Sequence, residues 1–273
     1  MGKKMIILVT VMLAFIAFIS LQGKAGELSG AITIAGSTSV QPLAEELAEV
    51  FMKKHPRVQI FVQGGGSSAG IQAVLSCTAD VGSSSRNLKP SEELYATTIA
   101  LDGIAIVINP KNPLAGITLQ EVQQIFAGEI TSWGKLGVTN RNLRNKDIVV
   151  VNREAGSGTR GAFEELVMDP VKKSLTVNSL VQAQTGAVQQ VIRTTETAIG
   201  YISLGFVENV KPLKIDGVEP NAQNIINGSY KIARPFLMAT KEKPTGLVKE
   251  FLDFVLSPEG QNLVTNNGYI SVN

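Results

Sequence analysis

The chain has 273 residues, of which 18% are charged and 44% hydrophobic, and its formal net charge at pH 7 is +2. This near balance excludes the strongly basic surface of nucleic-acid-binding proteins and a polybasic membrane patch. The single cysteine, Cys77, excludes an intramolecular disulfide, and the single histidine, His55, makes an ordinary zinc site improbable. We therefore expect no metal, no cofactor and no nucleic-acid partner.

The N-terminal segment has the layout of a secretory signal peptide. Lys3 and Lys4 precede an uncharged apolar run, and small residues follow at the two positions that a signal peptidase reads. We predict that residues 1–25 are the signal peptide and that cleavage follows Ala25. The run is shorter than the ~20 residues that span a bilayer comfortably, and retention as an N-terminal anchor is the alternative. No cysteine follows the run, which excludes a lipid-anchored form.

Removal of this segment would change the charge and the length of the protein. Three lysines leave with it, so the remaining 248 residues carry a net charge of −1. The basic isoelectric point is therefore a property of the precursor. A chain of this length exceeds one typical domain core and suits two domains of about 125 residues each.

The first part of the mature chain alternates short β-branched strands with helical patterns, as in a parallel sheet built from strand–helix units. Strands are predicted at residues 32–34, 58–62, 79–83 and 104–108, and a helix at residues 42–54. Leu43, Leu47 and Phe51 belong to the buried stripe of that helix. His55, where the helix ends, is expected to be solvated. Cys77 falls on an apolar face and is expected to be a small buried hydrophobe.

After residue 110 the pattern predicts a second unit. Thr118 and Glu121 form a capping box that opens a helix. Trp133, the only tryptophan, is expected to be a packing anchor. Further strands are predicted at residues 148–151 and 198–202, an extended segment at 230–238, and helices at 244–256 and 258 to about 266.

Extended stretches at residues 106–109 and about 230–234 flank the middle unit and indicate a second domain inserted into a discontinuous first one. We predict that domain I comprises residues 26–106 and 232–273 and that domain II comprises residues 107–231. A cleft between two such domains is a natural ligand site.

One local pattern occurs three times: a strand, a turn rich in glycine and hydroxyl residues, and a helix. The turns are at residues 36–39 (Gly-Ser-Thr-Ser), 64–68 (Gly-Gly-Gly-Ser-Ser) and 156–159 (Gly-Ser-Gly-Thr). Each leaves backbone N–H groups free at a helix N-terminus, and the hydroxyls add donors without charge. A single turn of this kind could merely cap its helix. Three of them, at the carboxyl edge of a doubly wound sheet, predict a cage for an oxyanion.

Arg153 supplies a charge to this cage. It lies at the end of a predicted strand, four residues before Ser157, where a guanidinium can fork onto two oxygens of a ligand. Taken alone, Arg153 could equally be a surface arginine.

One motif points to another class of protein. Residues 66–70 match GxSxG, the nucleophile elbow of hydrolases, and would make Ser68 the nucleophile of a secreted serine hydrolase. That triad requires a histidine after the serine in the chain, and His55 precedes it. The phosphate loop of NTPases and the GxGxxG dinucleotide pattern are both absent from the sequence. We therefore predict a binding protein, not an enzyme, and keep the hydrolase as the alternative of another class.

Several segments resemble the periplasmic phosphate-binding protein of bacterial phosphate ABC transporters. They are residues 35–42 (AGSTSVQP), 65–71 (GGSSAGI), 80–86 (DVGSSSR), 125–133 (IFAGEITSW), 153–160 (REAGSGTR) and 198–201 (AIGY). The resemblance covers nearly the whole mature chain in order, and the combination is highly specific.

This resemblance implies an α/β protein with the two-domain periplasmic-binding-protein type II fold. Each domain would be a mostly parallel sheet flanked by helices, with the ligand cleft between the domains. It further implies a periplasmic, monomeric protein that captures inorganic phosphate and delivers it to the permease subunits of an ABC transporter in the membrane, driven by a separate ATPase.

The resemblance also implies the ligand-binding residues. Matched position by position, the family's phosphate ligands fall on Thr38, Ser39, Ser67, Arg153, Ser157, Gly158 and Thr159. Ser37, Ser85 and Arg86 complete the candidate set, Ser37 as part of the first turn. Ser85 stands where long-chain relatives have an aspartate that accepts the proton of phosphate, and Arg86 follows it. Because that aspartate is absent, a receptor for sulfate or another tetrahedral oxyanion is the alternative within the class.

Overall fold

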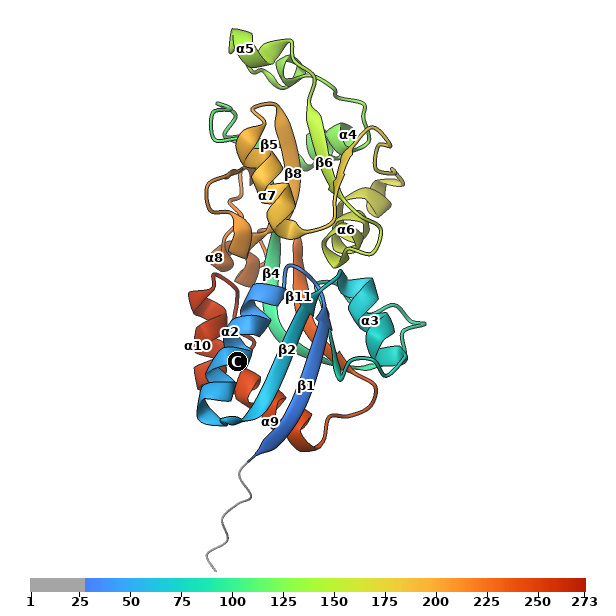
Figure 1. Ribbon diagram of the computed structural model, residues 1–273. Coiled ribbons are helices and arrows are strands. Elements are labelled where there is room, and N and C mark those ends of the chain that lie inside the picture. Colours follow the sequence, from blue (N-terminus) through green and yellow to red (C-terminus); the bar gives the residue numbers. More distant parts are fainter. Residues whose placement is uncertain (1–27) are drawn as a thin grey trace, which may run out of the picture.

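Two neighbouring strands lie in the middle of the molecule, where the chain passes between its two lobes (Figure 1). In this computed structural model, residues 28–273 are described, so the predicted signal peptide lies outside the described residues. Strand β4 (Tyr95–Ile108) pairs with β11 (Ala233–Thr240) along its first part and with β8 (Ala198–Ser203) along its last part, both times antiparallel. A single strand thereby carries one sheet from the first lobe into the second.

The strands form one large mixed sheet. In spatial order it contains β2 (Arg57–Gly64), β1 (Ser29–Gly36), β3 (Val81–Ser84), β11, β4, β8, β6 (Val149–Arg153) and β7 (Leu180–Gln182), with β9 (Lys211–Pro212) beside β4. The pairs β1–β2, β1–β3, β6–β8 and β6–β7 are parallel. A small parallel pair, β5 (Gly116–Ile117) and β10 (Lys214–Ile215), lies apart. The predicted α/β class, with a mostly parallel sheet flanked by helices, is confirmed.

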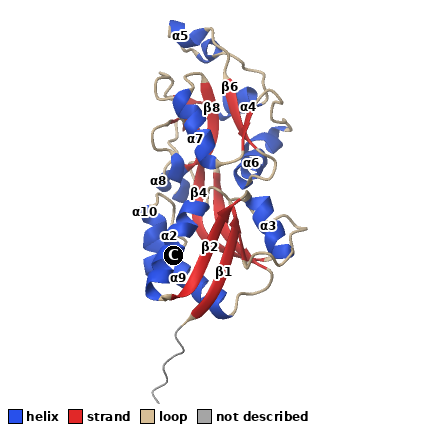
Figure 2. Ribbon diagram, in the orientation of Figure 1, coloured by secondary structure: helices blue, strands red, loops and turns tan. Residues whose placement is uncertain are grey.

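Helices cover the sheet in both lobes (Figure 2). Those of the first lobe are α2 (Gln41–Lys54), α3 (Ser67–Leu75), α9 (Gly246–Leu256) and α10 (Pro258–Asn266). Those of the second lobe are α4 (Leu119–Phe126), α5 (Arg141–Arg144), α6 (Gly158–Phe163), α7 (Thr185–Thr194) and α8 (Ala222–Ile226). Short 3-10 turns at Trp133–Leu136, Asp169–Val171 and Leu204–Phe206 and a π-helical turn at Glu164–Met168 complete the set. Within the described part of the chain, each helix is too short or too polar to cross a bilayer.

Each lobe has its own apolar core. In the first, the predicted stripe of α2 packs with β1 and α9, and Leu47, Phe51 and Phe251 are buried. In the second, Trp133 and Phe163 are fully buried, which confirms Trp133 as a packing anchor. Its indole N–H also donates to the carbonyl of Thr197 at 3.1 Å, so the ring is fixed in orientation.

Two further local predictions are confirmed. Thr118 accepts a hydrogen bond from the backbone N–H of Glu121, whose carboxylate accepts from the N–H of Thr118, so the capping box opens α4. His55 ends α2 and is half-exposed, with its ring 4.5 Å from that of Phe51.

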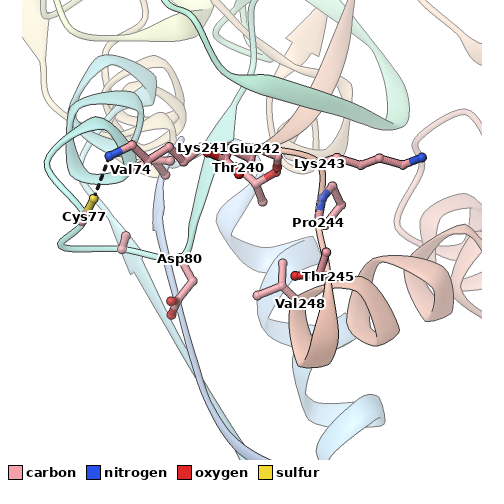
Figure 3. A pocket seen from close by; sticks show the side chains of 11 residues that line it. Val74, Cys77, Asp80, Thr240, Lys241, Glu242, Lys243, Pro244, Thr245 and Val248 are labelled. Carbon is pink, nitrogen blue, oxygen red and sulfur yellow. Dashed lines mark hydrogen bonds between the residues drawn. The ribbon is translucent and has the colours of Figure 1, made fainter.

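The prediction for Cys77 is wrong, because this residue is exposed. Helix α3 ends at Leu75, and Cys77 adopts a left-handed conformation with φ of 57°. The chain has therefore left the helical periodicity before it reaches the thiol. The sulfur lies 3.1 Å from Nζ of Lys241, at a surface pocket that Asp80 and Thr245 also line (Figure 3).

Candidate ligand-binding site

The three glycine-rich turns meet where the two lobes face each other. The first two follow the parallel neighbours β1 and β2, and they lie side by side at the carboxyl edge of the sheet. The backbone N–H groups of Gly65 and Gly66 both donate to the carbonyl of Gly36 at 2.8 Å. The second turn is therefore hydrogen-bonded directly onto the first.

Gly36 is required where the first turn leaves β1. Its φ is 141°, a conformation that L-residues rarely adopt, and an added Cβ would lie 2.2 Å from the carbonyl oxygen of Ser83. The next residue, Ser37, donates its N–H to that same oxygen at 2.9 Å. The first turn is thus held tightly against β3.

Hydroxyl groups from the first lobe form one buried cluster. Ser37 donates its hydroxyl to Oγ of Ser85 at 2.9 Å. Oγ of Ser67 accepts from the backbone N–H of Ser85 at 3.1 Å and lies 3.4 Å from its hydroxyl oxygen. All three side chains are buried. Ser85, which comes directly after β3, therefore lies with the two turns.

The third turn belongs to the second lobe and faces this cluster. The hydroxyl oxygens of Ser39 and Thr159 are 2.9 Å apart, and Ser68 donates its N–H to the carbonyl of Gly156 at 3.1 Å. These contacts bring groups from both lobes within reach of one small ligand.

Helix α6 begins at the third turn. Ser157 is its N-cap and accepts from the N–H of Arg160 at 3.2 Å. The first N–H groups of a helix, here those of Gly158 and Thr159, have no acceptor inside the helix. A Cβ on Gly158 would lie 2.1 Å from Oγ of Ser67. Glycine at this position therefore allows the two lobes to approach closely.

Arg153 brings a buried positive charge into this arrangement, and it is 2% exposed. Its Nη1 donates to Oγ1 of Thr185 at 3.0 Å, and its Nη2 donates to Oγ1 of Thr38 at 3.2 Å. Nε donates to the carbonyl of Gln182 at 3.1 Å, and Nη2 also donates to that of Ala183 at 3.0 Å. Burial lowers the pKa of the Arg153 guanidinium. These four hydrogen bonds all go to neutral oxygens, so they do not neutralise the charge.

Glu154 offsets this charge only in part. Its Oε1 lies 3.5 Å from Nη2 of Arg153, beyond normal hydrogen-bond distance, and its side chain is 30% exposed. Its other carboxylate oxygen is buried and has no hydrogen-bond partner among residues 28–273. An acceptor oxygen is therefore available beside the guanidinium.

Thr185 belongs to the same cluster and was missed by the sequence analysis. It opens α7 after the short strand β7, and it is fully buried. Its hydroxyl oxygen lies 3.2 Å from that of Thr38 and 2.8 Å from that of Ser39. The available signal was a Thr-Gly pair at the start of a helix.

Arg86 lies at the rim of the cluster and does not point into it. Its guanidinium donates to both carboxylate oxygens of Glu92, at 2.7 and 2.8 Å, and to the carbonyl of Asn87 at 2.7 Å. These contacts lower the pKa of Glu92. Arg86 also lines a cavity of about 420 Å³ between the lobes, together with Ser68 and Ser157. The charge of Arg86 is therefore already paired.

Taken together, the donors suit a small anion that is recognised on several sides. Hydroxyl and backbone N–H groups from both lobes surround one guanidinium, and ligand oxygens could replace the hydroxyl-to-hydroxyl contacts. The same geometry gives no support to a hydrolase. The Ser68 hydroxyl accepts a hydrogen bond from Arg86, at 3.4 Å. His55 is the C-cap of α2, a helix about 20 Å long whose other end begins at the first glycine-rich turn.

Comparisons with known proteins agree with this geometry. A sequence profile of the PBP superfamily domain matches residues 23–259. The chain is 33% identical over 294 residues to the phosphate-binding protein PstS of Bacillus subtilis strain 168, and the alignment covers 100% of this chain and 95% of the relative.

Solved structures are similar over most of their length. A structure from Clostridium perfringens, described as a phosphate ABC transporter substrate-binding protein with bound phosphate, gives a TM-score of 0.84 at 42% identity and covers 89% of this chain and 100% of that chain. An ABC-type phosphate transport receptor from Vibrio cholerae gives a TM-score of 0.72 at 35% identity, with 88% and 99% covered.

Proposed function

The chain belongs to the PBP superfamily and, within it, to the phosphate-binding proteins of ABC transporters, and on this premise we propose that the cage around Arg153 is its phosphate site. The protein captures inorganic phosphate for an ABC transporter. The observation that carries the assignment of the site is the buried Arg153 guanidinium, which donates to hydroxyls of both lobes and is paired only at 3.5 Å with the partly exposed carboxylate of Glu154. A buried charge of this kind needs a counter-ion, and phosphate supplies one.

We assign roles to the residues of the cage as follows. Arg153 forks onto two phosphate oxygens, and the remaining oxygens are bound by hydroxyl and N–H donors. These donors are Thr38, Ser39, Ser67, Ser157, Gly158 and Thr159, with Ser37 and Ser85 positioning them from the first lobe. We add Thr185, because its hydroxyl contacts both Arg153 and Ser39. Arg86 acts at the rim of the cavity and does not contact phosphate.

We further propose that the two lobes are the domains expected from the sequence, with residues 26–106 and 232–273 in domain I and 107–231 in domain II. Separate cores in the two lobes support this division. The lobes are joined through β4 and β11, and a small rotation about these strands would open the cage.

The setting of the protein is part of the same proposal. The segment of residues 1–25 directs export to the periplasm and is cleaved, and the mature protein is a monomer without a lipid anchor. It releases phosphate to the permease subunits of its transporter and performs no catalysis. The contact of the Ser68 hydroxyl with the Arg86 guanidinium, which cannot act as a base, supports the last point.

Isothermal titration with phosphate, sulfate and molybdate tests this function. We expect saturable binding of one phosphate per chain and weaker binding of the other two anions. A protein that binds sulfate or molybdate more tightly than phosphate would contradict the assignment. A chromogenic ester assay separates the hydrolase alternative, for which turnover that is lost in Ser68→Ala is the diagnostic result.

A further inference from the structure

A second buried arginine, Arg234, lies on β11 beside the cage. It is the direct cross-strand partner of Asp102 on β4. Its Nε and Nη2 donate to Oδ2 of Asp102 at 3.0 and 2.9 Å, and the two side chains are 1% and 0% exposed. The pair therefore occupies the two strands that connect the lobes.

This pair is hydrogen-bonded to both lobes of the molecule. Nη1 of Arg234 donates to the carbonyl of Ser85 at 3.0 Å, in the hydroxyl cluster of the first lobe. Oδ1 of Asp102 accepts from the hydroxyl of Ser203 at 2.9 Å and from the N–H of Leu204 at 3.1 Å. Ser203 is the last residue of β8 in the second lobe. A continuous buried chain of hydrogen bonds thus runs from the cage through both connecting strands to the other lobe.

Tyr269 makes a parallel link. Its hydroxyl donates to the carbonyl of Ser39, a cage residue, at 3.3 Å. The same hydroxyl packs so closely on Gly205 that a Cβ there would lie 2.3 Å from it. Two cage residues of the first lobe are therefore hydrogen-bonded to groups that also contact β8 or the 3-10 turn that follows it.

We propose that Asp102 and Arg234 are positioning residues for phosphate binding, which couple the geometry of the cage to the relative placement of the two lobes. Neither residue is assigned a contact with phosphate, and the inference rests on the function proposed above.

The physical basis is the rigidity of the guanidinium. It is a planar fork that holds Asp102 with two N–H groups and Ser85 with a third, so a displacement of one partner is transmitted to the other. Rotation of the second lobe moves Ser203 and strains its bond to Asp102. Phosphate that holds the cage in one arrangement will favour one arrangement of this chain of bonds.

The central test is the double variant Asp102→Asn/Arg234→Gln, which removes both charges together and leaves no buried charge unpaired. We expect it to fold and to bind phosphate at least about fivefold more weakly, within the usual range of about 5–150-fold for coupling between sites. Its ligand-induced change in radius of gyration should also differ from that of the wild type. Affinity within about twofold of wild type with an unchanged scattering response would overturn the proposal.

A milder variant keeps the test decisive if the double variant does not fold. Ser203→Ala removes one hydrogen bond between the second lobe and Asp102, and we expect about a threefold loss of phosphate affinity. Ser257→Ala is the matched control. It removes the N-cap of α10, which accepts from Gly260 at 3.2 Å, so it should lower the melting temperature without changing the affinity.

The control variant Ser257→Ala and the wild-type protein distinguish failure of the coupling from failure of the proposed function. An equal loss of affinity in Ser257→Ala and Ser203→Ala would reduce the effect to general stability and overturn the coupling. A wild-type protein that does not bind phosphate would instead contradict the proposed function itself.

Discussion

Arg153 and Arg234 are both almost fully buried, yet their surroundings differ. Arg234 donates two hydrogen bonds to one oxygen of Asp102. Arg153 contacts two threonine hydroxyls and two backbone carbonyls, while its nearest carboxylate, that of Glu154, is 3.5 Å away and partly exposed. The charge of Arg234 is neutralised by a close buried carboxylate, whereas that of Arg153 is offset only by a longer, partly exposed ion pair.

This difference distinguishes an arginine whose charge stabilises the fold from one whose charge can bind a ligand. A buried ion with a close counter-charge needs no further ion to neutralise it. A buried ion that is bound mainly by neutral dipoles keeps a net charge that can attract a ligand of opposite charge. Burial alone lowers the pKa of both guanidinium groups, so burial does not distinguish them. The distance to the nearest carboxylate distinguishes the two arginines.

The largest expected effect concerns folding stability. Arg234→Met should lower the free energy of unfolding by about 3–5 kcal/mol, because it leaves the buried Asp102 carboxylate without a counter-charge. Arg153→Met should cost less, about 2 kcal/mol, because the ion pair that it removes, with Glu154, is 3.5 Å long and partly exposed and the other partners are neutral hydroxyls and carbonyls. Urea denaturation of the ligand-free variants measures both values. Equal losses would remove the distinction between the two arginines.

Phosphate affinity should show the strongest dependence on Arg153. Arg153→Ala should weaken binding by about 2–5 kcal/mol, as expected when one partner of a buried charge-assisted contact is truncated. Arg193→Ala is the control, because Arg193 is an exposed residue of α7 whose side chain contacts only Gln190, and it should change binding by about 0–1 kcal/mol. Calorimetry that gives the same loss for both would contradict the site.

A smaller loss is expected when the approach of the lobes is obstructed. Gly158→Ala places a methyl group against Oγ of Ser67 and should weaken phosphate binding by about 1–3 kcal/mol through overpacking. Gly186→Ala is the matched control in α7, because an added Cβ there meets nothing within 4 Å. Equal phosphate affinity of the two variants would contradict the close approach of the lobes at Gly158.

Ion selectivity should change with the residue at position 85. Phosphate at neutral pH keeps a proton and sulfate does not, so a buried carboxylate accepts from the first and repels the second. Ser85 can rotate its hydroxyl to donate as well as accept. We therefore expect the wild type to prefer phosphate, and Ser85→Asp to raise the preference over sulfate about tenfold. Competition titration that finds complete rejection of sulfate by the wild type and no change in Ser85→Asp would show that Ser85 is not the discriminating position.

The smallest expected signal is conformational. Saturating phosphate should reduce the radius of gyration, because β4 and β11 allow the lobes to close on the ligand. Small-angle scattering is the suitable probe, since Trp133 is fully buried inside the second lobe and need not sense closure. An unchanged radius would argue against a hinge at these strands.

The local part of the site could be predicted from the sequence. A strand, a glycine and hydroxyl turn, and a helix are encoded within about ten residues, so the turns beginning at Gly36, Gly64 and Gly156 were found where the structure has them. Arg153 was found because it ends a strand directly before such a turn. The packing role of Trp133 followed from its residue type alone.

The missed features depend on the register of distant strands or on short elements. Asp102 and Arg234 are 132 residues apart and meet only because β4 and β11 pair antiparallel in that register. Thr185 follows a strand of three residues, two of them exposed, which leaves no periodic signal. The direction of Arg86 is decided by Glu92, six residues later in an irregular segment.

A crystal structure of the wild-type protein with phosphate tests the central claim most directly. We expect one phosphate between the lobes, with Nη1 and Nη2 of Arg153 within about 3 Å of its oxygens. Hydroxyls of Ser39 and Thr159 should also contact it, while Arg234 remains on Asp102. A phosphate bound elsewhere, with Arg153 still hydrogen-bonded to Thr38 and Thr185, would contradict the account.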